Sequence, residues 1–194
     1  MKICVTGHRP SKLSSEWGYD YNSVKWLRLK NIFKEFIKQN HVTYVYTGMA
    51  LGVDTVMALA VIELRYEGYP VKLICVLPCA EQSSMWIDSS KKLYYDILSI
   101  ADGIYGITEE SPYNVELVLR NIDNITKLFI KGKQVVEYST KYNKKLMSDR
   151  NRFLVDSTDS VVSVWDGTSS GTGHCVNYAL SKGKTVVNFK PDEV

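Results

Sequence analysis

Short apolar runs alternate along the chain with segments in which apolar residues recur at helical spacing. The runs are rich in β-branched residues and have no polar face, which is typical of strands buried on both sides of a sheet. Strands are predicted at residues 2–6, 42–47, 71–77, 103–107, 160–165 and 185–189, and helices at about 21–38, 53–68, 87–98, 140–157 and 174–183. This alternation predicts the α/β class, with a mostly parallel sheet and helices on both faces.

An additional helix is predicted between the fourth strand and the helix at 140–157. Ser111 and Pro112 suit an N-cap and a first helical residue, and an apolar stripe follows as far as Gly132. The stripe consists of Val115, Val118, Leu119, Ile122, Ile125, Leu128 and Phe129. Such a helix could cover the core, close over a ligand or form a dimer face, since a stripe does not say what buries it. We expect a homodimer in which two copies of the helix pack together.

Length and composition predict one domain over 1–194, with a helical insertion at about 111–137. The chain has 194 residues, of which 45% are hydrophobic and 23% charged, and its net charge of +3 does not by itself indicate a nucleic-acid partner. No apolar run suits a signal peptide or a membrane span, so we expect no membrane association. Four cysteines without paired spacing indicate a reduced compartment, and the expected location is cytoplasmic. No metal site and no cofactor are predicted.

Polar residues follow the strands at the ends that should meet. In parallel sheets, ligands bind outside the carboxyl ends of the strands, where the strand order reverses. The loops beginning at Gly7, Gly48, Pro78 and Gly167 all leave such ends, so we expect them to share one edge. The polar side chains expected there are Thr6, His8, Arg9, Thr47, Asp54, Glu81, Gln82, Asp166, Ser169, Ser170, Thr172 and His174.

The stretch 160–180 combines a strand, a loop of small residues and a helix. Asp166 and Gly167 end the strand, residues 168–173 are all small, and helical spacing resumes at Val176. This order brings free backbone N–H groups to a helix N-terminus, where the helix dipole favours an anion, most often a phosphate. A tight turn is the alternative, but six small residues exceed what a turn needs. We therefore expect a phosphate on the Gly171 loop.

Two arginines are the natural partners of such an anion, because a guanidinium binds phosphate in a planar fork. Arg150 is favoured over Arg9, since its helical neighbours lie on the buried stripe. His8 could donate to the phosphate or stabilise its own turn. Asp54 suits a cap at the start of a helix, and Asp166 could accept from loop N–H groups or meet a ribose hydroxyl.

Catalytic motifs are weak in this sequence. Cys175 lies in the first turn of a helix, where a thiolate is favoured, but the adjacent His174 points elsewhere and cannot serve as its base. No P-loop motif is present. The basic and aromatic segment 127–145 is more typical of a solvated face than of a nucleic-acid surface.

Five segments together resemble a known family. They read TGHRP, TGMALGVD, LPCAEQSSMW, MSDRNRFLVDSTDSVVSVWDG and GTGHCVNYALSKGKTVV, and they are similar to the YpsA-like branch of the SLOG superfamily, which includes the Smf/DprA and LOG proteins. The resemblance covers nearly the whole chain apart from about 111–137. It implies a Rossmann-like fold and a pocket for a nucleotide or a nucleotide-derived ligand.

The LOG relatives are phosphoribohydrolases, and part of their signature is present. Residues 147–151 match M-x-x-R-K through Met147 and Arg150, which implies that Arg150 faces the ligand. Gly171 and Thr172 match the later G-T, but Cys175 stands where those enzymes have a glutamate. Hydrolysis needs a carboxylate at the ribose, and a thiol cannot replace it.

We therefore expect a protein that binds a nucleotide-derived small molecule as a sensor, regulator or sequestering protein. The alternatives are an N-glycosidic hydrolase, with Glu81 or Asp166 as substitute carboxylate, and a DprA-like binder of single-stranded nucleic acid. The predicted ligand-binding residues are Thr6, Gly7, His8, Arg9, Gly48, Gly52, Asp54, Glu81, Gln82, Arg150, Asp166, Gly167, Ser169, Ser170, Gly171 and Thr172.

Overall fold

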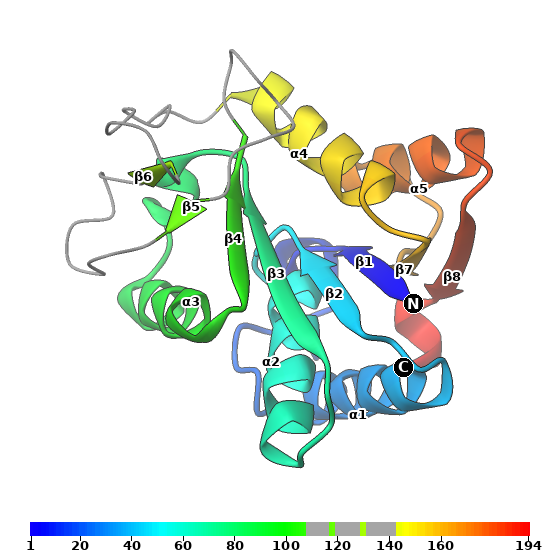
Figure 1. Cartoon of the computed structure of the whole chain (residues 1–194). Coiled ribbons are helices and arrows are strands. Elements are labelled where there is room, and N and C mark those ends of the chain that lie inside the picture. Colours follow the sequence, from blue (N-terminus) through cyan, green and yellow to red (C-terminus); the bar gives the residue numbers. More distant parts are fainter. Residues whose placement is uncertain (108–116, 119–128, 131–142) are drawn as a thin grey trace.

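The computed structural model describes residues 1–107, 117–118, 129–130 and 143–194. Its centre is a six-stranded sheet in which every neighbouring pair of strands is parallel, in the order β4-β3-β2-β1-β7-β8 (Figure 1). The strands are β1 (Lys2–Gly7), β2 (Tyr44–Thr47), β3 (Lys72–Leu77), β4 (Gly103–Gly106), β7 (Ser160–Val164) and β8 (Thr185–Phe189). The six strands predicted from apolar runs are confirmed.

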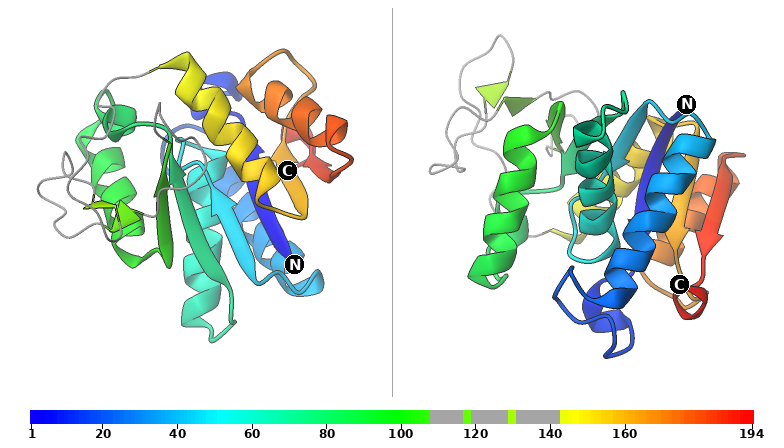
Figure 2. Two further views of the ribbon diagram at one scale, coloured as in Figure 1. Left: turned by 45° about the horizontal axis from the view of Figure 1, so that its top comes forward. Right: turned by 90° about the horizontal axis from the view of Figure 1, so that it is seen from below.

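Helices cover both faces of this sheet, as predicted. One face carries α1 (Val24–Gln39), α2 (Val53–Tyr66) and α3 (Asp88–Ile100), and the other carries α4 (Lys144–Asp156) and α5 (Gly171–Ser181) (Figure 2). Short 3₁₀ helices occur at η1 (Pro10–Lys12), η2 (Ala80–Ser83) and η4 (Pro191–Glu193). The fold is therefore an α/β sandwich of the Rossmann-like type.

The core explains why these segments adopt their structures. Along α1, Trp26, Leu29, Phe33 and Ile37 are fully buried, so one stripe of the helix packs on the sheet while the remainder faces solvent. All five residues of β7 are buried, because helices lie over both of its faces.

The strand order reverses between β1 and β7. From β1 the chain proceeds through β2 and β3 to β4 on one side, and it then returns to place β7 on the other side of β1. Val5 and Val162 are paired in this central register, so the carboxyl ends of both strands lie side by side. A crevice at such a reversal is the usual ligand site of open α/β sheets.

The prediction of a long helix at 111–131 is wrong for the four residues of this segment that the structure describes. Leu117–Val118 and Phe129–Ile130 form two short strands, β5 and β6, which pair antiparallel. Short apolar runs containing Val and Ile fit a strand as well as a helical stripe, and pairing between distant segments decides between them. The remainder of the predicted insertion lies outside the described residues. The homodimer was inferred from this helix and stays a prediction.

Among the described helices, none combines the length and the apolar character that crossing a bilayer requires.

Candidate anion-binding site

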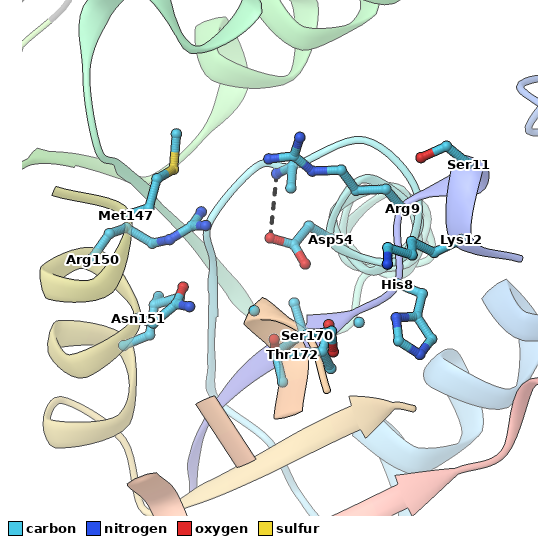
Figure 3. A pocket seen from close by; sticks show the side chains of 16 residues that line it. His8, Arg9, Ser11, Lys12, Asp54, Met147, Arg150, Asn151, Ser170 and Thr172 are labelled. Carbon is cyan, nitrogen blue, oxygen red and sulfur yellow. Dashed lines mark hydrogen bonds between the residues drawn. The ribbon is translucent and has the colours of Figure 1, made fainter. Parts of the chain in front are cut away.

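A cavity of about 390 Å³ opens at the carboxyl ends of the central strands (Figure 3). Its walls come from the end of β1 and the η1 turn, the start of α2, one side of α4 and the first turn of α5. The lining residues are Val5, Thr6, Gly7, His8, Arg9, Ser11, Lys12, Ala50, Asp54, Met147, Arg150, Asn151, Leu154, Ser170, Gly171 and Thr172.

The first turn of α5 presents backbone N–H groups to this cavity. Ser170 is the N-cap, and its Oγ accepts a hydrogen bond from the Gly173 N–H at 3.1 Å. The N–H groups of Gly171 and Thr172 precede the first intrahelical bond, so the helix itself supplies no acceptor for them. A Cβ atom added at Gly171 would have no neighbour within 4 Å, which leaves room for a ligand close to the backbone.

The observed loop before α5 is shorter than the predicted loop of six small residues. The helix begins at Gly171, so Gly171, Thr172 and Gly173 belong to α5 rather than to the loop. The Ser170 cap sets this boundary, because its side chain satisfies a first-turn donor. The free N–H groups of Gly171 and Thr172 therefore belong to the first turn of α5 and not to the loop before it.

Arg150 reaches the cavity from α4 and is buried, with 7% of its surface exposed. Its Nη1 donates a hydrogen bond to the backbone carbonyl of Gly48, which lies 102 residues away in the chain. The Nε–H has no hydrogen-bond partner among the described residues. Burial lowers the pKa of Arg150, and the nearby Asp54 carboxyl opposes that shift. The guanidinium is thus fixed in place and retains unused donor capacity.

Gly48 and Gln82 form the support behind this arginine. A Cβ atom at Gly48 would lie 1.7 Å from Arg150 Nη1, so only glycine lets the guanidinium approach the strand end. The Gln82 amide donates to the carbonyls of Gly48 and Met49 at 2.9 and 2.8 Å. Both residues were predicted to bind ligand directly, but neither lines the cavity. Gly48 contacts Arg150, and Gln82 contacts the backbone of Gly48 from behind.

Asp54 is the acidic residue of the cavity wall. The residue is 5% exposed, and its carboxyl accepts a hydrogen bond from the Ala50 N–H at 3.3 Å and lies below the Arg9 side chain in Figure 3. Burial raises the pKa of Asp54, while Arg150 and Arg9 act in the opposite direction. The predicted role of Asp54 at the start of a helix is compatible with this position in the first turn of α2.

Asp166 is held at the rim by His8 and by its own turn. Its Oδ1 lies 2.8 Å from His8 Nε2 and accepts from the backbone N–H of Thr168 at 2.9 Å and from that residue's hydroxyl. The Thr168 hydroxyl and N–H, together with His8, hold the pKa of Asp166 well below its usual range. Of the two roles considered for Asp166, acceptance from loop N–H groups is the one observed.

The structure brings most of the predicted residues together. Those that line the cavity are Thr6, Gly7, His8, Arg9, Asp54, Arg150, Ser170, Gly171 and Thr172. Gly52 is the N-cap of α2, with φ of 95°, and its N–H donates to the Tyr21 hydroxyl. Asp166 and Gly167 form the neighbouring turn, Ser169 faces a second cavity, and the exposed Glu81 lines neither.

Several lining residues were not predicted. Met147, Asn151 and Leu154 share a helical stripe with Arg150, so the spacing of α4 would have identified them once Arg150 was chosen. Lys12 enters through the η1 turn, which starts at Pro10 directly after Arg9. A proline at the first position of a short helix was the available signal.

A second cavity, of about 660 Å³, adjoins the first between α4 and α5. Its lining residues are Lys144, Met147, Ser148, Asn151, Arg152, Ser169, Ser170, Gly171, His174, Cys175 and Tyr178. Cys175 is 1% exposed, and burial raises the pKa of its thiol to about 11. It is therefore protonated at neutral pH, which argues against the nucleophilic role considered for it.

Fold and site together define a Rossmann-like α/β protein in which a helix N-terminus lines a cavity at the reversal of its strand order. Residues 3–126 match the model of the YspA SLOG family, and the chain belongs to that family. The match confirms the resemblance seen in the sequence motifs.

Proteins of Bacillus species are similar in sequence to most of this chain. It is 28% identical over 152 residues to the SPβ prophage-derived protein YoqJ of Bacillus subtilis (strain 168), covering 78% of both proteins. It is 24% identical over 189 residues to a UPF0398 protein of Bacillus thuringiensis (strain Al Hakam), covering 96% of this chain and 86% of the relative.

Solved structures of DNA processing protein A (DprA) share the fold. The Streptococcus pneumoniae protein aligns with a TM-score of 0.54 at 16% identity, over 96% of this chain and 49% of that chain. The Helicobacter pylori protein, described with its single-stranded DNA binding mode, aligns with a TM-score of 0.55 at 16% identity, over 97% of this chain and 64% of that one. The chain thus spans about half of the first neighbour's length and just under two thirds of the second's.

Proposed function

We propose that the protein binds a nucleotide or a nucleotide-derived small molecule, with a phosphate group seated between the first turn of α5 and Arg150. The observation that carries the proposal is the buried Arg150, which lines the same cavity as Gly171 and whose Nε–H has no hydrogen-bond partner among the described residues. A buried donor without a partner costs free energy, and an anionic oxygen is the acceptor to which a guanidinium donates most strongly.

The charges around the cavity favour an anion. Arg9, Lys12 and Arg150 line it, and Asp54 is the carboxylate among the described lining residues. The α5 dipole adds a positive partial charge at Gly171. Three cations and a helix end against one carboxylate give a site that attracts phosphate.

The dimensions of the cavity suit a small ligand. A volume of about 390 Å³ lies within the range of small-molecule sites, roughly 300–1,000 Å³. Val5, Met147 and Leu154 supply apolar wall next to the polar groups. This combination fits a phosphate joined to a less polar nucleoside part.

The titratable groups support binding without turnover. Glu81 lies outside both cavities, and Asp166 already contacts Thr168 and His8, which speaks against either residue as the substitute carboxylate of a hydrolase. The buried Cys175 is a neutral thiol at physiological pH. We therefore favour a sensor, regulator or sequestering protein. Among the described lining residues, Asp54 is the carboxylate that a hydrolase could use.

Calorimetric titration with AMP, adenosine, NAD and ADP-ribose tests this proposal. AMP should bind at least tenfold more tightly than adenosine, because only AMP carries the phosphate. Chromatography after prolonged incubation should recover each ligand unchanged. Equal binding of AMP and adenosine would contradict the phosphate site. Release of free base would show that the protein hydrolyses the N-glycosidic bond.

Single-stranded nucleic acid is the second candidate. The likeness to the H. pylori DprA structure, described with its single-stranded DNA binding mode, supports it at the level of the fold. The motifs and charge of the sequence favour a small molecule over nucleic acid, and this likeness supports the nucleic-acid alternative. Fluorescence anisotropy of labelled single strands decides: binding that AMP displaces and salt weakens would place a strand in the same site. No binding at low salt would exclude it.

A further inference from the structure

The two cavities adjoin each other along a shared boundary, here called the seam, and neighbouring stripes of α4 line them. Met147, Asn151, Ser170 and Gly171 belong to both linings. On α4, Met147, Arg150, Asn151 and Leu154 face the first cavity, while Lys144, Ser148 and Arg152 face the second. The second set is spaced four residues apart and therefore forms a continuous row beside the first. A ligand crossing the seam would contact both rows.

The second cavity is also electropositive. Lys144 and Arg152 line it, with His174 at the α5 end, and no aspartate or glutamate occurs among its described lining residues. Ser170 and Gly171 bring the α5 N-terminus to this side too. Its volume of about 660 Å³ exceeds that of the first cavity, so it has room for a further nucleoside and phosphate.

Arg152 is held at this cavity by an aromatic ring. Its guanidinium lies 5.7 Å from the centroid of Tyr178, and the Lys182 ammonium lies 5.3 Å from the same centroid. The Tyr178 hydroxyl lies 3.1 Å from both carboxylate oxygens of Asp156, so the ring itself is anchored. Cation–π contact places Arg152 without using its N–H donors, which remain available to an anion.

We propose that the second cavity is an anion subsite for a second phosphate of the same ligand. The ligand class is then a nucleotide with two phosphates one nucleoside apart, such as a 5′-phosphorylated dinucleotide, rather than a mononucleotide. The first phosphate lies against Arg150 and Gly171, and the second against Arg152 and Lys144. This inference rests on the proposed function of the first cavity.

Calorimetry of the 194-residue chain with AMP and the 5′-phosphorylated dinucleotide pApA tests the inference. Wild-type protein should bind pApA at least tenfold more tightly than AMP. Arg152→Gln should weaken pApA about tenfold and leave AMP within twofold, because it removes a charge-assisted contact from the second phosphate alone. Lys144→Gln is the second variant and should act in the same direction.

Lys182→Gln is the matched control. It removes one positive charge next to the same Tyr178 ring, but Lys182 lines neither cavity, so both affinities should stay within twofold of wild type. A longer 5′-phosphorylated strand identifies the source of the second phosphate. The same affinity as pApA supports a dinucleotide ligand, and a further tenfold gain supports consecutive phosphates of a strand.

The outcomes separate the two proposals. If AMP binds but pApA binds no better, or if Arg152→Gln weakens both ligands equally, the second subsite is refuted and the first cavity stands. If wild-type protein binds neither ligand, both proposals fail.

Discussion

The guanidinium of Arg150 lies directly against the backbone of Gly48 and donates to its carbonyl across 102 residues of sequence. Replacement of Gly48 by alanine would put a Cβ atom 1.7 Å from Nη1, so the side chain of Arg150 would have to move. The backbone at Gly48 has no positive φ, and the effect should therefore come from this displacement rather than from backbone strain.

We predict that Gly48→Ala lowers affinity for AMP at least tenfold, about 1.4 kcal/mol, while the protein stays folded. The double variant Gly48→Ala/Arg150→Ala should bind no more weakly than Arg150→Ala, because the displaced group is then absent. Calorimetry and thermal unfolding measure both effects. Additive losses in the double variant would contradict this coupling.

Arg150→Ala should weaken phosphorylated ligands far more than the matching nucleosides. Loss of a charge-assisted hydrogen bond costs about 1.5–3 kcal/mol, which corresponds to roughly a tenfold to hundredfold loss of affinity. AMP and adenosine are titrated in parallel. Arg28→Ala, at an exposed position on α1, serves as the control and should change neither affinity. Equal losses for AMP and adenosine would mean that Arg150 has a structural role only.

Gly171→Val should abolish binding of AMP and leave the fold intact. The new side chain enters open space at the cavity and occupies the approach to the N–H groups of Gly171 and Thr172. Gly173→Ala is the contrasting variant, since its Cβ would lie 3.1 Å from both the Thr168 carbonyl and the Trp165 ring. It should lower the melting temperature. A folded Gly171→Val protein with wild-type affinity would place the site elsewhere.

The stabilising effect of Asp166 should depend on pH. Its pKa in the folded protein is lowered by Thr168 and His8 from the usual 3.8, so the charged form contributes stability at neutral pH. That contribution is fully present at pH values above the pKa of Asp166 in the unfolded chain, and it is lost as the pH falls through about 4 and below. Asp166→Asn should therefore be less stable than wild type at pH 7, with a smaller difference at pH 3. Urea unfolding at both values tests this, and a difference independent of pH would refute it.

Cys175 should be unreactive in the native protein. Its pKa of about 11 leaves roughly one thiol in a thousand ionised at pH 8, and the side chain is 1% exposed. Mass spectrometry after iodoacetamide at pH 8 should find Cys175 unmodified in folded protein and alkylated in urea. Rapid alkylation of the native protein would revive the nucleophile hypothesis.

Local patterns in the sequence were sufficient for the strands and for most helices. Apolar runs such as residues 160–164 form buried strands because a sheet covered on both faces needs no polar side, and the stripe of α1 follows from helical periodicity. The choice of Arg150 followed in the same way, since its neighbours lie on the buried side of α4. The family resemblance rested on motifs in the same segments.

Contacts between distant segments were decided by the tertiary structure alone. No local pattern shows that Gly48 must lack a Cβ atom to admit Arg150, or that Asp166 contacts His8, because these pairs are 102 and 158 residues apart. The apolar residues at 117–118 and 129–130 fit a helix by spacing, yet they pair as strands. Periodicity reports which side of an element is buried, whereas the partner that buries it is set by how the whole chain packs.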